Sequence, residues 1–153
     1  MIEVFANGRK FSYWTGAKIG RSLDHIAASF SLNLVARDPI GNVVKLFPGD
    51  SVEIAVDGTT VIKGYVEKFS TSFSAGSHTF SVSGSEISCD IADCCVENPM
   101  EWQNKTLDQI ISDICCRFGL FFKNEMGVDV GKPLKKFSVD PGVKALETMT
   151  KLC

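Results

Sequence analysis

Apolar residues recur at every second position through much of the stretch from Phe47 to Ser85, which is the period of a β-strand with one buried face. Asp57-Gly58 lies between two such runs and predicts a tight hairpin, because both residues tolerate positive φ. Pro48-Gly49-Asp50 and Ala75-Gly76-Ser77 predict further turns. Gly64, inside a strand pattern, predicts a bulge or a close backbone approach. The stretch therefore predicts a β-meander of antiparallel strands.

The residues before this meander predict more strands. Ile2 to Trp14 has the pattern of a hairpin around Asn7-Gly8, which favours a type I′ turn. Ser22 to Ala28 has apolar residues at helical spacing and predicts a single helical turn. Phe30 to Leu34 alternates again, and turn-forming residues at positions 38–42 end that strand. With about six strands in all, we expect a small sandwich or a closed barrel.

The pattern changes after Gly84. The segment from Ser85 to Val96 predicts a brief helix or an extended connector, and Asn98-Pro99 breaks the chain. Thr106 then begins a clear helix, because Thr106 and Gln109 have the spacing of a capping box. One face of this helix is apolar, and Gly119 stops it. The apolar positions are Leu107, Ile110, Ile111, Ile114 and Phe118.

Two further strands and a second helix are expected beyond this point. Leu120-Phe121-Phe122 predicts a buried strand, and the region of Phe137 and Val139 predicts another. Asp140-Pro141 precedes a helix with one apolar face, formed by Val143, Leu146 and Met149. The predicted fold class is therefore α+β. An antiparallel β-barrel or sandwich-like meander spans residues 1–88, and a small α/β domain spans residues 89–153.

The final helix has no stop signal. Leu152-Cys153 closes the chain without Gly, Asn or Pro, inside an apolar pattern. One interpretation is a natural C-terminal helix that frays. The interpretation we favour is a domain truncated at its C-terminal end, so that the chain is a piece of a longer protein.

Composition excludes several function classes. The 153 residues are 44% hydrophobic and 22% charged, which is typical of a globular protein. The formal net charge is −2 and Lys and Arg form no cluster, so we expect no nucleic-acid partner. No apolar run approaches the roughly 20 residues that span a bilayer, and the N-terminus lacks the pattern of a signal peptide. A soluble chain that is neither exported nor inserted in a membrane is expected.

The six cysteines do not form a metal-binding pattern. Cys94-Cys95 and Cys115-Cys116 are adjacent pairs, and neighbouring side chains point in different directions. A zinc site from Cys89, Cys94, Cys115 and a distant histidine is the alternative. We favour buried, reduced cysteines without disulfides.

No residue is predicted to be catalytic, cofactor-binding or metal-binding, and no cofactor is expected. Neither histidine lies in a known catalytic motif. The spacing of the acidic residues on predicted strands does not indicate that two of them meet as a general acid and base. Tryptophans at strand ends more often pack in a core or interface than stack against a ligand. The residues considered are His25, His78, Glu53, Glu67, Trp14 and Trp102.

The order of short motifs resembles the N-terminal part of the Mu-type phage tail protein that forms the baseplate hub of contractile tails. The resembling residues span nearly the whole chain. They are Trp14, Arg21-Ser22-Leu23, Phe30-Ser31-Leu32, Pro48-Gly49-Asp50 with Val52 and Ile54, Gly64-Tyr65-Val66, Ser83-Gly84-Ser85, Asp93-Cys94, and Trp102 followed by Asn104-Lys105-Thr106-Leu107.

This resemblance implies a structural protein of a phage or prophage virion tail rather than an enzyme. Such hubs join β-barrel domains to small α/β domains and form a trimeric ring between the tail tube and the spike. The implied partners are two more copies in the full-length protein and the tail tube and spike proteins, with assembly in the host cytoplasm. One departure is clear, because Ser85-Glu86-Ile87 stands where the family usually has a basic cluster.

Two other functions remain as alternatives. A glycan- or cell-wall-binding module is one, because Phe137-Ser138-Val139 before Pro141-Gly142 and an apolar helix resembles the opening of a LysM repeat. A tail-associated peptidoglycan hydrolase is the other. For the structural reading, the strand edge around Phe69 to Phe73 is a hypothetical site of β-strand addition by a neighbour.

Overall fold

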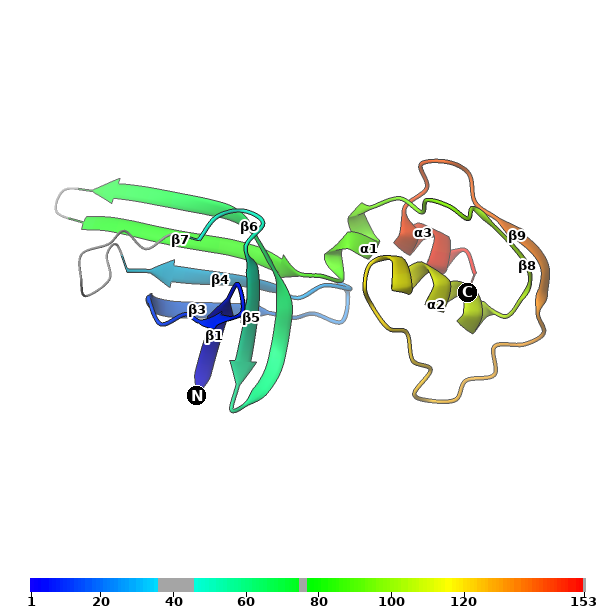
Figure 1. Ribbon diagram of the computed structural model, residues 1–153, viewed down its shortest axis with the longest axis horizontal. Helices are drawn as coiled ribbons and strands as arrows, with labels where there is room; N and C mark the ends of the chain where they lie inside the picture. The colour runs from blue at the N-terminus through cyan, green and yellow to red at the C-terminus, as the bar shows by residue number, and fades with distance from the viewer. Residues whose placement is uncertain (36–45, 75–76, 153) are drawn as a thin grey trace. The chain divides into compact units, whose positions relative to one another are not determined.

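The computed structural model describes residues 1–35, 46–74 and 77–152, with side chains described outside 73–78. The chain forms two compact units, Met1–Ile87 and Ser88–Cys153. Figure 1 shows strands in the first unit and a mixture of helices and strands in the second.

The described residues of the first unit form one antiparallel sheet of seven strands in the order β2-β1-β5-β6-β7-β4-β3, most of which are labelled in Figure 1. It curls into a half-barrel whose end strands, β2 and β3, are not paired with each other in the described structure. The predicted meander is confirmed as β5, β6 and β7, whereas the expected sandwich or closed barrel is replaced by this open sheet. The strands are β1 Ile2–Ala6, β2 Arg9–Lys10, β3 Trp14–Gly20, β4 Ser29–Leu34, β5 Ser51–Val56, β6 Thr59–Ser74 and β7 Ser77–Glu86.

Both predicted two-residue hairpin turns are confirmed. Asn7 and Gly8 have φ of 49° and 74°, and Asp57 and Gly58 have φ of 50° and 80°. Positive φ at both positions is the type I′ geometry, whose twist matches that of the flanking strands. The turns expected at 38–42 and at Ala75-Gly76 lie outside the described residues.

In the region before Leu34 one strand was not predicted and one expectation is wrong. β3 was not predicted, because a register shift between Trp14 and Gly16 interrupts the alternation of its apolar residues. The segment from Ser22 to Ala28 contains turns and bends rather than a helical turn. Its ends are held by contacts with distant strands, which a local spacing of apolar residues does not reveal.

The core of the first unit lies on one face of the sheet, as the alternation predicts. Gly64 and Gly84 allow the backbones of β6 and β7 to approach each other closely. A Cβ on Gly64 would lie 1.9 Å from the Ser85 carbonyl oxygen, and one on Gly84 would lie 2.0 Å from the Tyr65 carbonyl oxygen. The close approach predicted at Gly64 is therefore confirmed. The buried residues are Val4, Ala6, Ala28, Phe30, Leu32, Leu34, Leu46, Val52, Ile54, Ile62, Val66 and Val82.

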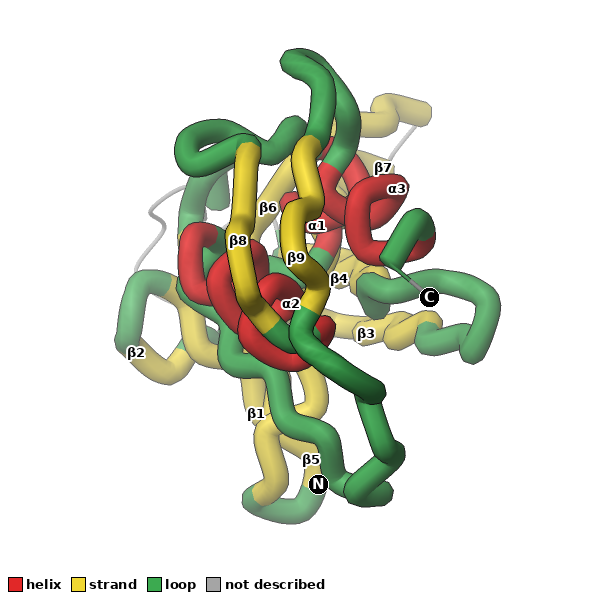
Figure 2. The backbone as a smooth tube through the Cα atoms, turned by 90° about the vertical axis from the view of Figure 1, so that its right-hand side faces the viewer, coloured by secondary structure: helices red, strands yellow, loops and turns green. Residues whose placement is uncertain are grey.

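The second unit has three helices and one pair of antiparallel strands, β8 and β9, which run side by side (Figure 2). Its elements are α1 Cys89–Asp93, β8 Glu101–Lys105, α2 Leu107–Arg117, β9 Leu134–Ser138 and α3 Ala145–Thr150. Its core is separate from that of the first unit. The buried residues are Ile91, Val96, Trp102, Ile110, Ile111, Ile114, Cys115, Val139 and Ala145.

The capping box of α2 is confirmed. Thr106 Oγ1 accepts the Gln109 backbone N–H at 3.4 Å, and Gln109 Oε1 accepts the Thr106 backbone N–H at 3.1 Å. The two bonds satisfy backbone donors that have no partner within the helix. Gly119 follows the helix with φ of 68°, in the conformation that ends helices.

In the second unit one predicted strand is wrong, one strand was not predicted, and the predicted apolar face of the last helix is right in part. Residues 120–122 do not form a buried strand, and Phe121 is 96% exposed. β8 was not predicted because Trp102 is the only buried residue in it. Of the predicted apolar face of the last helix, Val143 and Met149 pack against the core, whereas Leu146 is 36% exposed. The fully buried side chains in α3 are Ala145 and Thr148. Small side chains fit the close packing of this short helix, which a pattern of large apolar residues does not reveal.

Candidate functional site

The sequence analysis considered two histidines and two glutamates as candidate catalytic residues and predicted that none of them is catalytic. They are His25, His78, Glu53 and Glu67. His25 is exposed in the connection between β3 and β4, and the side chain of His78 lies outside the described part. Glu53 on β5 accepts a hydrogen bond from Thr60 at 2.6 Å. Glu67 on β6 lines a different hollow from Glu53, so the structure does not bring the two carboxylates together as an acid and a base.

The tryptophans act as anchors. Trp14 packs against the first core, and Trp102 is only 3% exposed in the second. The Arg117 guanidinium lies 5.6 Å from the Trp102 ring centroid, and Phe137 lies 5.8 Å away on β9. Trp102 Nε1 has no hydrogen-bond acceptor within the described structure. A ring enclosed on this scale does not offer a face to a ligand.

The cysteines that the structure describes do not form a metal site. No group of three or more His, Cys, Asp or Glu residues with suitable geometry occurs among the described residues. Cys115 is buried, and this burial, together with the neighbouring Cys116, raises the pKa of its thiol. Cys94, Cys95 and Cys116 are exposed. The prediction that the cysteines are buried is therefore right for Cys115 and wrong for these three.

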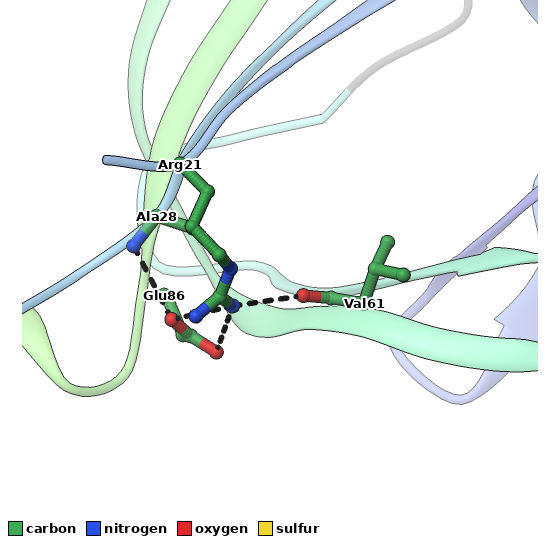
Figure 3. Close-up of polar contacts among 4 residues, drawn as sticks. All are labelled: Arg21, Ala28, Val61 and Glu86. Carbon is green, nitrogen blue, oxygen red and sulfur yellow. Dashed lines mark hydrogen bonds and ion pairs between the residues drawn. The ribbon is translucent and has the colours of Figure 1, made fainter. Parts of the chain in front are cut away.

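One ion pair fixes the connection between β3 and β4, which we call the 21–28 loop. Arg21 Nη2 lies 2.9 Å from Glu86 Oε1 and donates to the Val61 carbonyl oxygen at 3.1 Å (Figure 3). Glu86 also accepts the Ala28 backbone N–H at 3.2 Å. One carboxylate thus holds both ends of the loop. The sequence analysis did not predict this ion pair. The only signal for it was the position of Arg21 directly after β3 and of Glu86 at the end of β7.

A hollow of about 660 Å³ lies on the first unit, over β1, β5 and β6; we call it the outer hollow. Phe5, Glu53 and Lys63 are register partners across these strands. They alternate with the buried residues of the same strands, so they lie on the face opposite the core. The hollow is lined by Phe5, Gly8, Gly49, Ser51, Val52, Glu53, Lys63, Gly64, Tyr65 and Ile87.

The second unit presents a smaller hollow of about 440 Å³ beside α2. Asp108 lines it and accepts a hydrogen bond from Asn124 at 3.3 Å, while its other carboxylate oxygen is buried without a partner in the described structure. On β8, hydrogen bonds from Lys136 and Gln103 hold the pKa of Glu101 below its ordinary value. The contacts of Asp108 and Glu101 therefore join neighbouring segments of the second unit.

Among the described residues, no helix has the length and apolar content that crossing a membrane requires. The exposed apolar side chains are distributed over both units, and include Leu23 and Phe47 in the first and Phe121 and Met126 in the second. Single exposed apolar side chains are common on protein surfaces and do not by themselves mark a binding site.

Residues 1–86 match the family model described as Mu phage baseplate assembly protein GpP-like, N-terminal. The chain belongs to this Mu baseplate family. Residues 88–153 match a second model of the same kind, the second domain of baseplate hub protein gp44-like proteins. The resemblance to Mu-type baseplate hub proteins is therefore confirmed.

Three similar proteins accompany this result, the last of them similar in fold alone. Baseplate hub protein gp44 of Escherichia phage Mu is 31% identical over 126 residues, which are 82% of this chain and 33% of gp44. The crystal structure of the prophage MuSo2 43 kDa tail protein from Shewanella oneidensis matches with a TM-score of 0.81 at 29% identity, over 99% of this chain and 46% of that one. A tail protein from Neisseria meningitidis MC58 shares the fold, with a TM-score of 0.69 at 19% identity over 99% of this chain and 44% of that one.

The chain spans between a third and just under half the length of these three proteins. Membership makes it a tail protein of the baseplate type, from families of structural proteins. The 21–28 loop and the outer hollow are therefore best considered as surfaces of an assembly component.

Proposed function

We propose that this chain is part of a ring-shaped baseplate hub that lies between the tail tube and the spike of a phage or prophage tail. The observation that carries the proposal is the succession of two baseplate models along one chain, over residues 1–86 and 88–153. The TM-score of 0.81 to a prophage tail protein over 99% of the chain supports it.

The proposed domain organisation is a β-domain over residues 1–88 followed by a small α/β domain over residues 89–153. In this arrangement the half-barrel supplies the wall of a ring, and the proposed partners are further copies, as a homo-trimer of the full-length protein, with tail tube and spike proteins. Permanent, symmetric contacts need extended strands and apolar patches and no titratable group with a special pKa. The function proposed is therefore structural and not enzymatic, with neither nucleic acid nor membrane insertion involved.

Immuno-electron microscopy tests this role. Antibodies raised against the chain are applied to tails released from cells that encode it, and to tails from a strain in which its gene is deleted. We expect label at the baseplate end of the tail, and none in the deletion strain. Label spread evenly along the tube would contradict a hub position. Subunits that assemble before lysis would also be found in the host cytoplasm by fractionation.

A glycan- or cell-wall-binding module remains a prediction. The chain is mixed with purified peptidoglycan and sedimented, and an unrelated globular protein serves as the control. Specific retention, together with absence of label at the baseplate, would favour this alternative over the hub.

A further inference from the structure

The second unit has a long connection between α2 and β9, residues 120–133, which we call the 120–133 loop (Figure 1, yellow to orange). Phe121 in this loop is 96% exposed, Met126 is 90% exposed and Val128 is 62% exposed, and Phe122 is exposed as well. Among the connections that the structure describes in full, none exposes as many large apolar side chains. Scattered apolar residues are ordinary on a surface, whereas a group along one segment is a candidate contact surface.

Hydrogen bonds and packing hold this loop in one shape. Leu120 packs against the core, and its backbone N–H donates to the Cys115 carbonyl oxygen at 3.1 Å, which fixes the start of the loop. Asn124 closes the turn that carries Met126, because its side chain accepts the Val128 backbone N–H at 3.0 Å and donates to the Val128 carbonyl oxygen at 2.8 Å. A loop that is ordered before binding loses less conformational entropy when a partner covers it.

The loop does not bury its most exposed side chains against its own unit. The hollow beside α2 is lined in part by Phe122 and Asn124, but neither Phe121 nor Met126 lines it. Asn124 holds the loop to the helix through its hydrogen bond to Asp108 at 3.3 Å. The loop is therefore fixed in a position that leaves Phe121 and Met126 in solvent in the isolated chain.

The charges beside the loop are complementary to an acidic partner. Residues 120–138 contain four lysines and two acidic residues, whereas the formal net charge of the whole chain is −2. Lys132 and Lys135 have no ion-pair partner within the described structure, and Asp129 accepts the Gly131 backbone N–H at 2.9 Å. Two ammonium groups are thus left for a partner at the C-terminal end of the loop. The paired groups are Lys123 with Glu125 and Lys136 with Glu101.

A different protein fits this surface better than a lipid bilayer or a second copy of the chain. Glu125 and Asp129 stand next to Met126 and Val128 in the sequence, so inserting the loop into lipid would carry carboxylates into the interface at a cost. A second copy offers an apolar recess in the outer hollow, but Glu53 there lies opposite Lys63, so this recess has no excess negative charge. The matching surface is an apolar recess with carboxylates at its rim.

We propose that the 120–133 loop docks into an apolar recess on a different protein of the tail. Phe121 and Met126 are the side chains that the partner buries, and carboxylates of the partner face Lys132 and Lys135. The inference rests on the proposed function, because it names the surface through which the hub subunit contacts a neighbouring tail component. It also gives a role to residues 120–122, whose apolar sequence predicts a buried strand.

Oxidation of Met126 by dilute hydrogen peroxide reports whether the loop is covered. Mass spectrometry follows the rate in this chain, in the purified full-length protein and in assembled tails, with urea-unfolded chain as the reference for full access. We expect Met126 to react equally fast in the first two samples and at least about tenfold more slowly in tails, because a packed contact excludes solvent from its anchors. Fast oxidation in tails would overturn the proposal. Slow oxidation already in the purified full-length protein would also overturn it, because its own chain or a second copy would then cover the loop.

Substitution of the two apolar anchors tests their contribution. The double variant Phe121→Ser with Met126→Ser is produced as full-length protein in the deletion strain, and immunoblots compare its amount in purified tails with that in the soluble fraction. We expect incorporation to fall at least about tenfold, since loss of central anchors has effects of this size. Leu23→Ser with Phe47→Ser is the matched control, because both residues are exposed in the first unit. Circular dichroism checks the fold of each variant. Unchanged incorporation of the first pair, or equal loss by both pairs, would overturn the proposal.

A charge reversal tests the acidic rim. Lys132→Glu with Lys135→Glu is expected to lower incorporation into tails roughly fivefold, because like charges then face each other across the contact. Lys18→Glu with Lys68→Glu makes the same change in net charge on exposed lysines of the first unit, and no loss is expected. Equal incorporation of the two variants would contradict an acidic partner.

Photo-cross-linking identifies the partner. Benzoylphenylalanine at position 121 of the full-length protein is activated in assembled tails, and mass spectrometry locates the products. Cross-links to a different tail protein, at a site with both apolar and acidic residues, support the proposal. Cross-links only between copies of this chain would overturn it.

A vesicle assay covers the remaining class of partner. The chain is sedimented with vesicles of phosphatidylserine and phosphatidylcholine, and we expect no retention. Retention that Phe121→Ser with Met126→Ser abolishes would overturn the proposal in favour of a lipid surface. Each of these failures leaves the antibody label at the baseplate, whereas failure of the proposed hub function would appear as missing label there.

Discussion

Gly64 shows how one missing side chain shapes the sheet. Its backbone lies against the Ser85 carbonyl group, where any Cβ would be 1.9 Å from the oxygen. That oxygen belongs to the backbone of a paired strand and cannot rotate away. The glycine is therefore required by packing between β6 and β7.

We predict that Gly64→Ala destabilises the first unit by roughly 3 kcal/mol or more, because β6 and β7 must separate to admit the methyl group. Hydrogen exchange with mass spectrometry, read on peptides from residues 1–87, measures the loss. Gly16→Ala is the control, since its Cβ would meet only the Asn33 side chain at 3.3 Å. Equal protection in Gly64→Ala and wild type would show that the strands tolerate the group.

Cys115 differs from its neighbour in burial. Burial raises the pKa of the Cys115 thiol and limits access, so less thiolate is available at a given pH. We expect iodoacetamide at mildly alkaline pH to modify Cys116, Cys94 and Cys95 well before Cys115. Mass spectrometry of tryptic peptides follows the order, and urea-unfolded chain is the control, in which all should react alike. Early modification of Cys115 in the folded chain would contradict its burial.

At the scale of elements, the N-terminus of α2 is stabilised by a local device. The reciprocal bonds of Thr106 and Gln109 satisfy two donors at the start of the helix. The same helix then buries Ile110 and Ile114 in the core. Capping and burial therefore agree, which explains why this helix was predicted accurately.

Thr106→Ala is expected to lower the stability of the second unit by about 1 kcal/mol, the usual cost of losing an N-cap hydroxyl. Urea unfolding followed by circular dichroism at a helical wavelength gives the change. Thr150→Ala serves as the control, because the Thr150 hydroxyl bonds only the Leu146 carbonyl oxygen within α3 and its loss should cost under about 0.5 kcal/mol. If both variants lower the free energy of unfolding by the same amount, the capping bonds add no stability beyond that of an ordinary hydroxyl contact in a helix.

At the scale of the whole molecule, β6 extends beyond β5 and leaves part of one edge without a strand partner among the described residues. β6 pairs with β5 only as far as Tyr65 but with β7 as far as Ser74. From Glu67 to Ser74, the second edge of β6 has no strand partner within the described structure. The hypothesis of strand addition near Phe69 to Phe73 stays a prediction, and this edge is where it would act.

In the isolated chain, we expect the backbone amides from 67 to 74 to fall into two alternating groups, one protected by β7 and one exchanging rapidly. Hydrogen exchange by NMR separates the groups. Residues 80–85 of β7 are the control, because they pair with both β4 and β6 and should all be protected. Uniform protection from 67 to 74 in a monomer would mean that the chain covers this edge itself.

Local patterns determined much of this protein. Turns at Asn7-Gly8 and Asp57-Gly58, the alternation in β4 and β5, and the cap of α2 depend on neighbours in sequence, so their physics is readable without coordinates. The ordered succession of short motifs also led to the correct family, because such motifs reflect turns and strand ends that the fold requires.

Tertiary contacts decided the rest. The strand order of the half-barrel, the fixing of the 21–28 loop by Glu86, and the outer hollow all join residues far apart in the chain. The exposure of Phe121 and the burial of Trp102 in β8 likewise depend on which other segments of the chain pack against each side chain. The pattern of hydrophobic residues indicates which side chains prefer to be buried. Whether a given side chain is buried depends on the packing of segments that are distant in the sequence.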